Sequence, residues 1–313
     1  MTDWRPSASA AALRQRAELL SRVRDFFTQR GLIEVQTPLI TASGVTDLHI
    51  ESVATDTPAG WLRTSPEYFH KRLLAAGFGD LYELGPVFRR GESGRNHQPE
   101  FTLLEWYRVG WSWRRLAEEV VDLIDHALPT TQGTRNVRWL GWNDCFLASL
   151  GIDALAADTG ELERLAEDAP KGLDRDALLD WLFATRIQPG FDDGTLTVVH
   201  DYPASQAALA RIHPEDARLA ERFEVFAGPM ELANGYRELT DAQEQRQRFE
   251  RDNRSRRDNG QAPMPIDTAL LEAMAEGLPE CAGVALGFDR LLMAASGEET
   301  IERVVSFAHR LSL

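Results

Sequence analysis

The fold is decided by ELGPVFRRGESGRNHQPEFTLLEWY, residues 83–107, in which two apolar stretches flank a long polar loop. Apolar and aromatic runs bounded by Gly, Pro and Asn are typical of strands, so the pattern predicts strand, loop, strand. In the second strand the period of two places Phe101, Leu103, Glu105 and Tyr107 on one face. A plain core face would not carry Glu105, although a single glutamate can also be a salt-bridged residue at the rim of a sheet.

A second polar strand face lies in the segment NGYRE, where the same alternation puts Asn234, Tyr236 and Glu238 on one side. Glu224 and Glu231 come shortly before this segment. Carboxylates brought together beside a polyphosphate are typical ligands of magnesium. Each of these two glutamates alone is better explained as a solvated surface charge.

Arginines stand at both ends of this set of motifs. Arg89 and Arg90 close the first strand, and Arg290 follows the glycine-rich run GVALGFD. Guanidinium groups bind phosphate oxygens through paired hydrogen bonds, which indicates a nucleotide; a surface pair between Asp289 and Arg290 is the alternative. The chain lacks GxxxxGK[ST], and GVALG does not match GxGxxG, so a nucleotide would bind outside the two commonest nucleotide folds.

Other segments supply the remaining elements of the predicted fold. Apolar residues recur at helical spacing over residues 13–27 and stop before Gly31, which predicts an amphipathic helix. LIEVQTPLI, residues 32–40, predicts a strand broken at Pro38. We further expect a helix at 65–77, strands at 195–203 and 223–239, a charged helix at 241–260, and a strand followed by a helix at 283–296.

Strands joined by short connections, with helices outside them, predict an α+β fold in which helices flank an antiparallel sheet. We expect a single catalytic domain over residues 1–313 with a disordered tail at 1–10. Residues 112–190 are helical in pattern, acidic and free of any chemical cluster, so we interpret them as an insertion. The arginine-rich helix 246–257 alternates its arginines with Asp and Glu, which favours a solvated helix over a docking surface.

Composition excludes several classes of function. With 313 residues, of which 43% are hydrophobic, the chain is long enough for one large core. The net charge of −15 opposes a broad nucleic-acid-binding surface, although a local basic patch remains compatible with it. Cys145 and Cys281 lie far apart and outside any metal motif, so we expect buried thiols. No apolar run is long enough for a membrane span and no secretory signal is present, which predicts a soluble cytoplasmic protein.

At this point the ordered segments resemble a known family. RGLIEVQTP, then ELGPVFRR with HQPEFTLLEWY, then MELANGYREL with GVALGFDRLLM are similar to the three motifs of class II aminoacyl-tRNA synthetases, and the lysine-specific branch fits best. About a dozen residues precede the first helix, so no anticodon-binding domain is expected. TSPEY and VVHDYPASQAALA are similar to the elongation factor P–(R)-β-lysine ligase family, whose members attach (R)-β-lysine to a lysine side chain of elongation factor P.

The resemblance implies ATP and Mg²⁺ as co-substrate and cofactor. Arg89 would hold the α-phosphate and the substrate carboxylate, Phe101 and Arg290 would enclose the adenine, and His97 would lie near the triphosphate. Arg89 and Arg290 would be the catalytic residues, and Glu224 and Glu231 would bind the metal. The complete ATP set implied is Arg89, Glu92, His97, Gln98, Phe101, Glu231, Leu232, Gly287 and Arg290.

The resemblance also implies a pocket for the amino acid. Glu67 would meet its nearer amino group, Asn234 its carboxylate, and Glu105, Tyr107 and Glu238 its distal ammonium. Several acidic partners suit a substrate that carries two ammonium groups, whereas adenylation needs cations. Ser65, Pro66, Tyr236 and Ala285 would complete the pocket lining.

Three departures from the synthetase pattern carry expectations of their own. FRRGE replaces FRNE, so the glutamate expected at the adenine amino group is either missing or supplied by Glu92. Gln98 replaces an asparagine and keeps the amide. Ala285 replaces a glycine of lysyl-tRNA synthetases, and its methyl group is hypothesised to shift preference from α-lysine to a β-isomer by about 1–3 kcal/mol.

Two alternatives stay open at this stage. A minimal lysine-activating enzyme would charge tRNA or a small molecule, and an inactive paralogue would act as a regulator. The resemblance further implies a homodimer across the segment 32–40 and no stable binding of tRNA.

Overall fold

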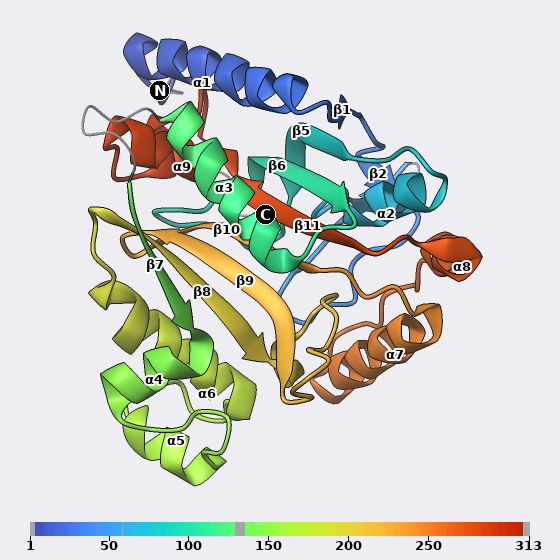
Figure 1. Ribbon diagram of the computed structural model, residues 1–313, viewed down its shortest axis with the longest axis vertical. Helices are drawn as coiled ribbons and strands as arrows, with labels where there is room; N and C mark the ends of the chain where they lie inside the picture. The colour runs from blue at the N-terminus through green and yellow to red at the C-terminus, as the bar shows by residue number, and fades with distance from the viewer. Residues whose placement is uncertain (1–3, 58, 129–134, 309–313) are drawn as a thin grey trace.

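The computed structural model describes residues 4–57, 59–128 and 135–308. Its main sheet has eight strands in the order β1-β5-β6-β11-β10-β9-β8-β7 (Figure 1). Every pairing from β5 through to β8 is antiparallel, and the two edge strands β1 and β7 pair in parallel, which confirms the predicted sheet. The strands are β1 Ile33–Glu34, β5 Leu81–Phe88, β6 Glu100–Val109, β7 Asn136–Gly141, β8 Thr195–Pro203, β9 Leu219–Ala227, β10 Met230–Arg237 and β11 Cys281–Gly287.

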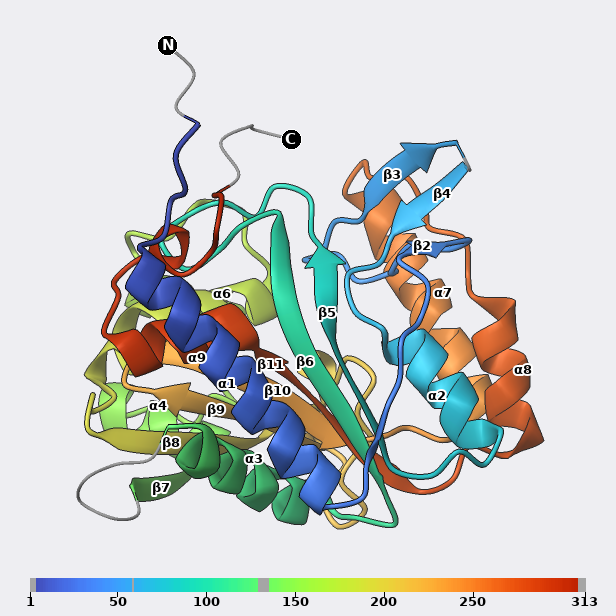
Figure 2. The ribbon, with the colours of Figure 1, turned by 90° about the horizontal axis from the view of Figure 1, so that it is seen from above.

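One face of this sheet is apolar and covered by helices. Leu104 and Trp106 of β6 and Val284 of β11 are buried there in the largest core cluster, because alternate residues of a strand point to the same side. Helices α1 Ala10–Gln29, α3 Trp113–Ala127 and α9 Phe288–Ser296 close this face. Figure 2 shows α1 and α3 lying across it.

The opposite face is covered only at its two ends. Tyr107, Leu81 and Cys281 pack there against α2 Glu67–Ala75, α7 Ala242–Asp258 and α8 Thr268–Gly277. At the other end Val199 and Phe226 pack against α4 Trp142–Leu150, α5 Thr159–Leu165 and α6 Arg175–Leu182. The middle of this face remains for polar side chains.

A small second sheet lies beside α7 and α8 in the view from above (Figure 2). Its strands β2 Ile40–Thr41, β4 Ala59–Leu62 and β3 Val53–Asp56 pair in that order. Thus LIEVQTPLI forms two short strands, β1 and β2, with Pro38 between them, as predicted. The remaining short helical turns are Phe183–Ile187, Gln188–Gly190, Ala204–Gln206 and Ile301–Arg303.

The predicted insertion at 112–190 is wrong in its first part. Helix α3 belongs to the main core, where Leu116, Val120 and Leu123 are fully buried. Strand β7 extends the main sheet by pairing with β8. Only α4 to α6 form a separate cluster, built around Trp142 and Phe146. Residues 129–134 lie outside the described residues.

Two further expectations need correction. The tail 1–10 is not disordered over its described part, since Ser7 N–H donates to Ser306 O at 2.9 Å and Ala8 is buried; residues 1–3 lie outside the description. The arginine-rich helix is not wholly solvated, because buried Arg248 donates to the carbonyls of Ala208 and Ala210. Arg256 is also buried, whereas Arg254 and Arg257 are exposed as expected.

Cys145 and Cys281 are buried free thiols, as predicted. Within the described ranges, no helix is both long enough and apolar enough to cross a bilayer.

Candidate active site

A polar row crosses the open face of the sheet. β-pairing puts Glu83 opposite Glu105, Glu105 opposite Ala285, Ala285 opposite Asn234, and Asn234 opposite Glu224. Directly paired residues share a face, so side chains from five strands line up there. The two polar strand faces predicted separately around Glu105 and Asn234 thus form one surface, joined through Ala285.

The next row places two phenols beside a glycine. Tyr107 lies opposite Gly283, Gly283 opposite Tyr236, and Tyr236 opposite Arg222. A Cβ atom at Gly283 would stand 2.3 Å from Tyr107 Cε1 and 2.4 Å from Glu238 Oε1. Only glycine therefore lets these two polar side chains occupy the space above β11.

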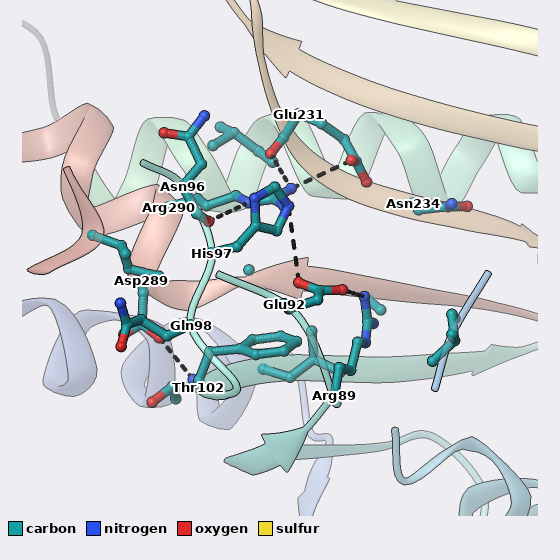
Figure 3. A pocket seen from close by; sticks show the side chains of 17 residues that line it. Arg89, Glu92, Asn96, His97, Gln98, Thr102, Glu231, Asn234, Asp289 and Arg290 are labelled. Carbon is teal, nitrogen blue, oxygen red and sulfur yellow. Dashed lines mark hydrogen bonds and ion pairs between the residues drawn. The ribbon is translucent and has the colours of Figure 1, made fainter. Parts of the chain in front are cut away.

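One cavity collects the residues expected to bind ATP (Figure 3). Figure 3 shows Arg89 and Glu92 on one side of it, and His97, Arg290 and Glu231 on another. Asn234 and Ala285 also line it, so the cavity ends beside the polar rows. The nucleotide residues that line it are Arg89, Glu92, His97, Gln98, Phe101, Glu231, Leu232, Gly287 and Arg290.

Arg290 is held by groups on two other segments. Its guanidinium donates to the main-chain oxygen of Glu231 at 3.1 Å and lies 3.3 Å from Glu231 Oε2. It also lies 2.6 Å from His97 Nε2, and burial together with this positive charge lowers the pKa of His97. A neutral imidazole can accept at Nε2 from Arg290. The neighbouring Asp289 does not pair with Arg290.

Asp289 instead anchors the cavity wall. It is buried, and its carboxylate accepts from the Thr102 N–H and from Arg16 of α1. The alternative of a surface pair between Asp289 and Arg290 is therefore wrong. Across the cavity, Arg89 donates to Glu92 at 3.3 Å and its guanidinium lies 5.1 Å from the centre of the Phe101 ring.

The residues expected to bind the amino acid gather next to the cavity through direct hydrogen bonds. Buried Glu105 accepts from the Ser65 hydroxyl at 2.7 Å and from the Tyr107 hydroxyl at 2.9 Å. Glu67 accepts from the Tyr236 hydroxyl at 2.8 Å. Pro66, which immediately precedes α2, is also buried, so the whole segment 65–67 faces the polar rows.

Lys71, which sequence reasoning missed, lies within this set. Its Nζ is 2.7 Å from Glu67 Oε1 and 2.6 Å from Glu238 Oε2, and its side chain is fully buried. Burial alone would lower the pKa of Lys71, but Glu238 and Glu67 raise it above its ordinary value. Burial raises the pKa of Glu238 to about 8, an effect that Lys71 only partly offsets. The i, i+4 spacing of Glu67 and Lys71 was the one signal available.

A second missed group lies beneath Glu105. His70 Nε2 lies 3.1 Å from Glu83 Oε2, and His70 Nδ1 lies 3.6 Å from Glu105 Oε1. Glu83 is further held by Arg63 at 2.7 Å and by the Thr37 hydroxyl at 2.8 Å. Burial opposes charge on His70, yet the two carboxylates raise its pKa above the usual value. This buried chain connects Glu105 with the segment around Thr37.

The two glutamates expected to bind metal differ in their surroundings. Glu224 Oε1 accepts from Arg222 at 2.6 Å and from the Asn234 amide at 3.2 Å, and burial raises the pKa of Glu224 to about 7. Glu231 forms an ion pair with Arg290 and lines the cavity. Among the residues that the structure describes, no group of three or more His, Cys, Asp or Glu side chains could hold a metal ion. Arg222 was also missed from the sequence.

The sheet, with its arginine-lined cavity beside a buried acidic pocket, defines a class II aminoacyl-tRNA synthetase core. The family model for class II tRNA synthetases (D, K and N) matches residues 1–310. The chain is 46% identical to an elongation factor P–(R)-β-lysine ligase of Pectobacterium atrosepticum, over 98% of both chains. It is also 46% identical to the elongation factor P–(R)-β-lysine ligase of Proteus mirabilis, over 98% of both chains, and to that of Histophilus somni, over 97% of both chains. The chain therefore belongs to this class II family and, within it, to the elongation factor P–(R)-β-lysine ligases.

Proposed function

We propose that this protein is an ATP-dependent ligase that activates (R)-β-lysine as an aminoacyl-adenylate and transfers it to a lysine ε-amino group of elongation factor P. The observation that carries the proposal is the continuity of the site. The arginine-lined cavity ends at Ala285 and Asn234, directly beside the buried carboxylates of Glu105 and Glu238 and the partly buried carboxylate of Glu67. The names of the relatives, at 46% identity over nearly the whole chain, support the choice of substrates.

Activation requires a nucleotide held in line with the substrate carboxylate. That carboxylate is ionised near neutral pH and attacks the α-phosphorus directly; an oxygen–phosphorus bond forms and pyrophosphate leaves. Arg89 and Arg290 provide guanidinium donors for the negative charge that grows on the phosphoryl oxygens. Neutral His97 fixes Arg290 rather than competing with it for the anion. Phe101 supplies an aromatic face for the base.

Glu224 and Glu231 are suitable ligands for a Mg²⁺ ion that is bound together with the phosphates of ATP. Magnesium is usually bound by one or two carboxylates together with substrate phosphates and water, so two glutamates beside the cavity are sufficient. Arg222 and Asn234 both engage Oε1 of Glu224 and thereby orient its carboxylate. When bound, the ion would neutralise charge on the phosphates. Glu92, which faces Arg89 inside the cavity, takes the place of the displaced glutamate at the adenine.

Charge balance favours an amino acid with two ammonium groups. The pocket carboxylates Glu67, Glu105 and Glu238 outnumber the single ammonium of Lys71 by two when all are ionised. A lysine isomer supplies two ammonium groups, whereas its carboxylate points toward Asn234 and Arg89. Buried charges are stable only when they are paired, so a monoammonium amino acid would leave one carboxylate unpaired whenever His70, 3.6 Å from Glu105, is neutral.

In the second step the acceptor amine attacks the carbonyl carbon of the adenylate. A carbon–nitrogen bond forms, AMP leaves with the bonding electrons, and the amine loses one proton. We propose elongation factor P rather than tRNA as the acceptor, in agreement with the acidic net charge of −15. We also place the reaction in the cytoplasm, where ATP and the translation machinery are found.

We propose that the protein acts as a homodimer through the segment around β1 and β2. Ile33, Leu39 and Ile40 are 47%, 38% and 40% exposed, and β1 ends the main sheet. Apolar side chains beside an unpaired sheet edge are a typical contact surface. The buried chain from Thr37 to Glu105 would join this interface to the pocket.

ATP–pyrophosphate exchange with (R)-β-lysine and α-lysine in parallel tests the proposal, followed by addition of elongation factor P or total tRNA. Exchange that prefers (R)-β-lysine, with label transferred to the protein, is the expected result. Label on tRNA would identify a minimal synthetase instead. Absence of exchange with either amino acid would overturn the proposal and leave an inactive paralogue.

A further inference from the structure

Lys71 is unusual because its charge is buried inside a helix packed on the sheet. Lysines on helices ordinarily extend their ammonium group to water. Lys71 instead lies one turn after Glu67 on α2, with no exposed side-chain surface. Its Nζ reaches Glu238, which follows β10, and lies 5.9 Å from the centre of the Tyr236 ring. The ammonium thus ties α2 to the central strands at the pocket.

Each of the two carboxylates that contact Lys71 uses only one of its two oxygens for that contact. Glu67 Oε1 receives both Lys71 and the Tyr236 hydroxyl, and Glu238 Oε2 receives Lys71. Among the described residues, no side chain donates to Glu67 Oε2; Glu238 Oε1 is a buried oxygen without a hydrogen-bond partner, and Glu238 Oε2 has only its ion pair with Lys71. Buried acceptors are normally satisfied, so an unsatisfied one at this position points to a donor that arrives with a ligand.

We infer that Lys71 is a positioning residue for the amino-acid substrate, whose ammonium joins Glu67 to Glu238 so that each keeps one oxygen for a substrate ammonium. The inference rests on the proposed function, because it assigns these oxygens to a diamino acid. The ammonium of Lys71 stays in the pocket when the substrate binds; it does not occupy the place of a substrate ammonium that would displace it. Its stem is enclosed within the fold, and departure would leave its ammonium without either partner.

Removal of the ammonium should affect the amino acid and not the nucleotide. In Lys71→Met, Glu67 and Glu238 lose the cation that joins them, and mutual repulsion raises the pKa of Glu238 further above its wild-type value of about 8. A protonated carboxyl group cannot pair with an ammonium group as a carboxylate does. The titratable groups that face this ammonium are Glu67 of α2, Tyr236 and Glu238 at the end of β10, and Cys281 of β11. Glu105 and Tyr107 of β6 act on it only through Glu238, with which they interact electrostatically.

The test measures ATP–pyrophosphate exchange by Lys71→Met at several pH values. Direct binding of (R)-β-lysine is measured separately, as a shift of the melting temperature. We expect the KM for the amino acid at pH 7.5 to rise at least tenfold, and to recover in part toward pH 9. The KM for ATP should change less than twofold, which also reports a folded cavity. The matched control is Arg72→Met, since Arg72 is the next residue on α2 and is exposed.

The outcomes separate this inference from the proposed function. An amino-acid KM within twofold of wild type in folded Lys71→Met would overturn the positioning role. An equal loss for ATP and amino acid, with an unchanged pH profile, would make Lys71 purely structural and overturn it as well. If the wild type binds (R)-β-lysine without exchange, the proposed function fails while binding to the variant still decides the role of Lys71. A wild type that binds no lysine isomer would overturn both.

Discussion

Gly283 lies directly opposite Tyr107 in the sheet, and the missing side chain of the glycine makes the space that the phenol ring occupies. The same space admits Glu238, which approaches from the end of β10. A backbone position without a side chain thus determines where two polar groups of the pocket can stand.

Gly283→Ala should impair binding of the amino acid more strongly than it lowers the stability of the fold. The new methyl group would lie far inside contact distance of Tyr107 and Glu238, and overpacking of this kind costs about 1–3 kcal/mol. We expect a lower melting temperature and a larger proportional rise in the KM for the amino acid, measured by thermal denaturation and exchange. In Gly190→Ala the methyl group meets nothing within 4 Å, so that variant serves as control. Unchanged exchange by Gly283→Ala would show that the pocket can relax.

Binding of the amino acid should strengthen as the pH rises from 7 to 9. The pKa of Glu238 is about 8, so most of this carboxyl group is protonated at pH 7 and cannot receive an ammonium. Since the apparent dissociation constant scales inversely with the competent fraction, affinity at pH 7 should be about tenfold below its alkaline limit. The distal amine of the substrate, which meets Glu238, stays charged over this range because a lysine side-chain amine titrates at about 10.4. Calorimetry across the range checks this, and Glu238→Gln should abolish the dependence; a flat wild-type profile would contradict it.

Arg290→Lys should slow activation although it keeps the charge. A lysine cannot contact Glu231 and His97 together as the guanidinium does. Loss of one preorganised donor typically lowers kcat by about 10²–10³-fold, and we expect exchange to fall by that order. Arg303→Lys, at an exposed arginine, should leave exchange unchanged. Near-normal kcat for Arg290→Lys would argue against a role in stabilising the transition state.

Ala285 tests the basis of selectivity between lysine isomers. Its methyl group lines the cavity between Glu105 and Asn234, where the reacting end of the amino acid would lie. Ala285→Gly should shift the ratio of kcat/KM for α-lysine over (R)-β-lysine toward α-lysine by the equivalent of about 1–3 kcal/mol. A ratio that stays constant in exchange assays would remove this explanation.

The assembly should depend on the exposed apolar residues at the sheet edge. Ile40→Asp places a charge among side chains that a partner subunit would cover, so we expect the mass in solution to fall from dimer to monomer. Phe78→Asp, at a residue that is 54% exposed on another segment, is the control and should leave the mass unchanged. Light scattering distinguishes these outcomes. A wild-type monomer at micromolar concentration would contradict the proposed dimer.

Strands that carry the site could be predicted because each has a clear period of two between glycine or proline signals. β6 lies within a few residues of its predicted position, and the predicted strand segment 223–239 is divided between β9 and β10. The pairing through Ala285 that puts Glu105 and Asn234 on one face does not follow from the alternation within either strand. The ATP set meets in one cavity because it comes from the loop between β5 and β6, the starts of β6 and β10, and the junction of β11 with α9.

What could not be predicted depends on packing. The apolar stripe of α3 is the same whether the helix covers the main sheet or a separate lobe, so its place in the core was missed. Lys71 looks like any surface lysine of an amphipathic helix until α2 is placed against Glu238. The role of Arg222 likewise becomes visible only from its contacts with Glu224 on the same strand and with Asn234 on the adjacent strand.

The separation of the two sheet faces has a consequence for redesign. In β6, Leu104 and Trp106 build the core, while Glu105 and Tyr107 build the pocket. Combinatorial libraries restricted to the second set could therefore explore new substrates while the main core beneath α1, α3 and α9 stays intact. The same interleaving makes any one-residue slip of strand register doubly harmful, because it would bury carboxylates and expose the hydrophobic face at once.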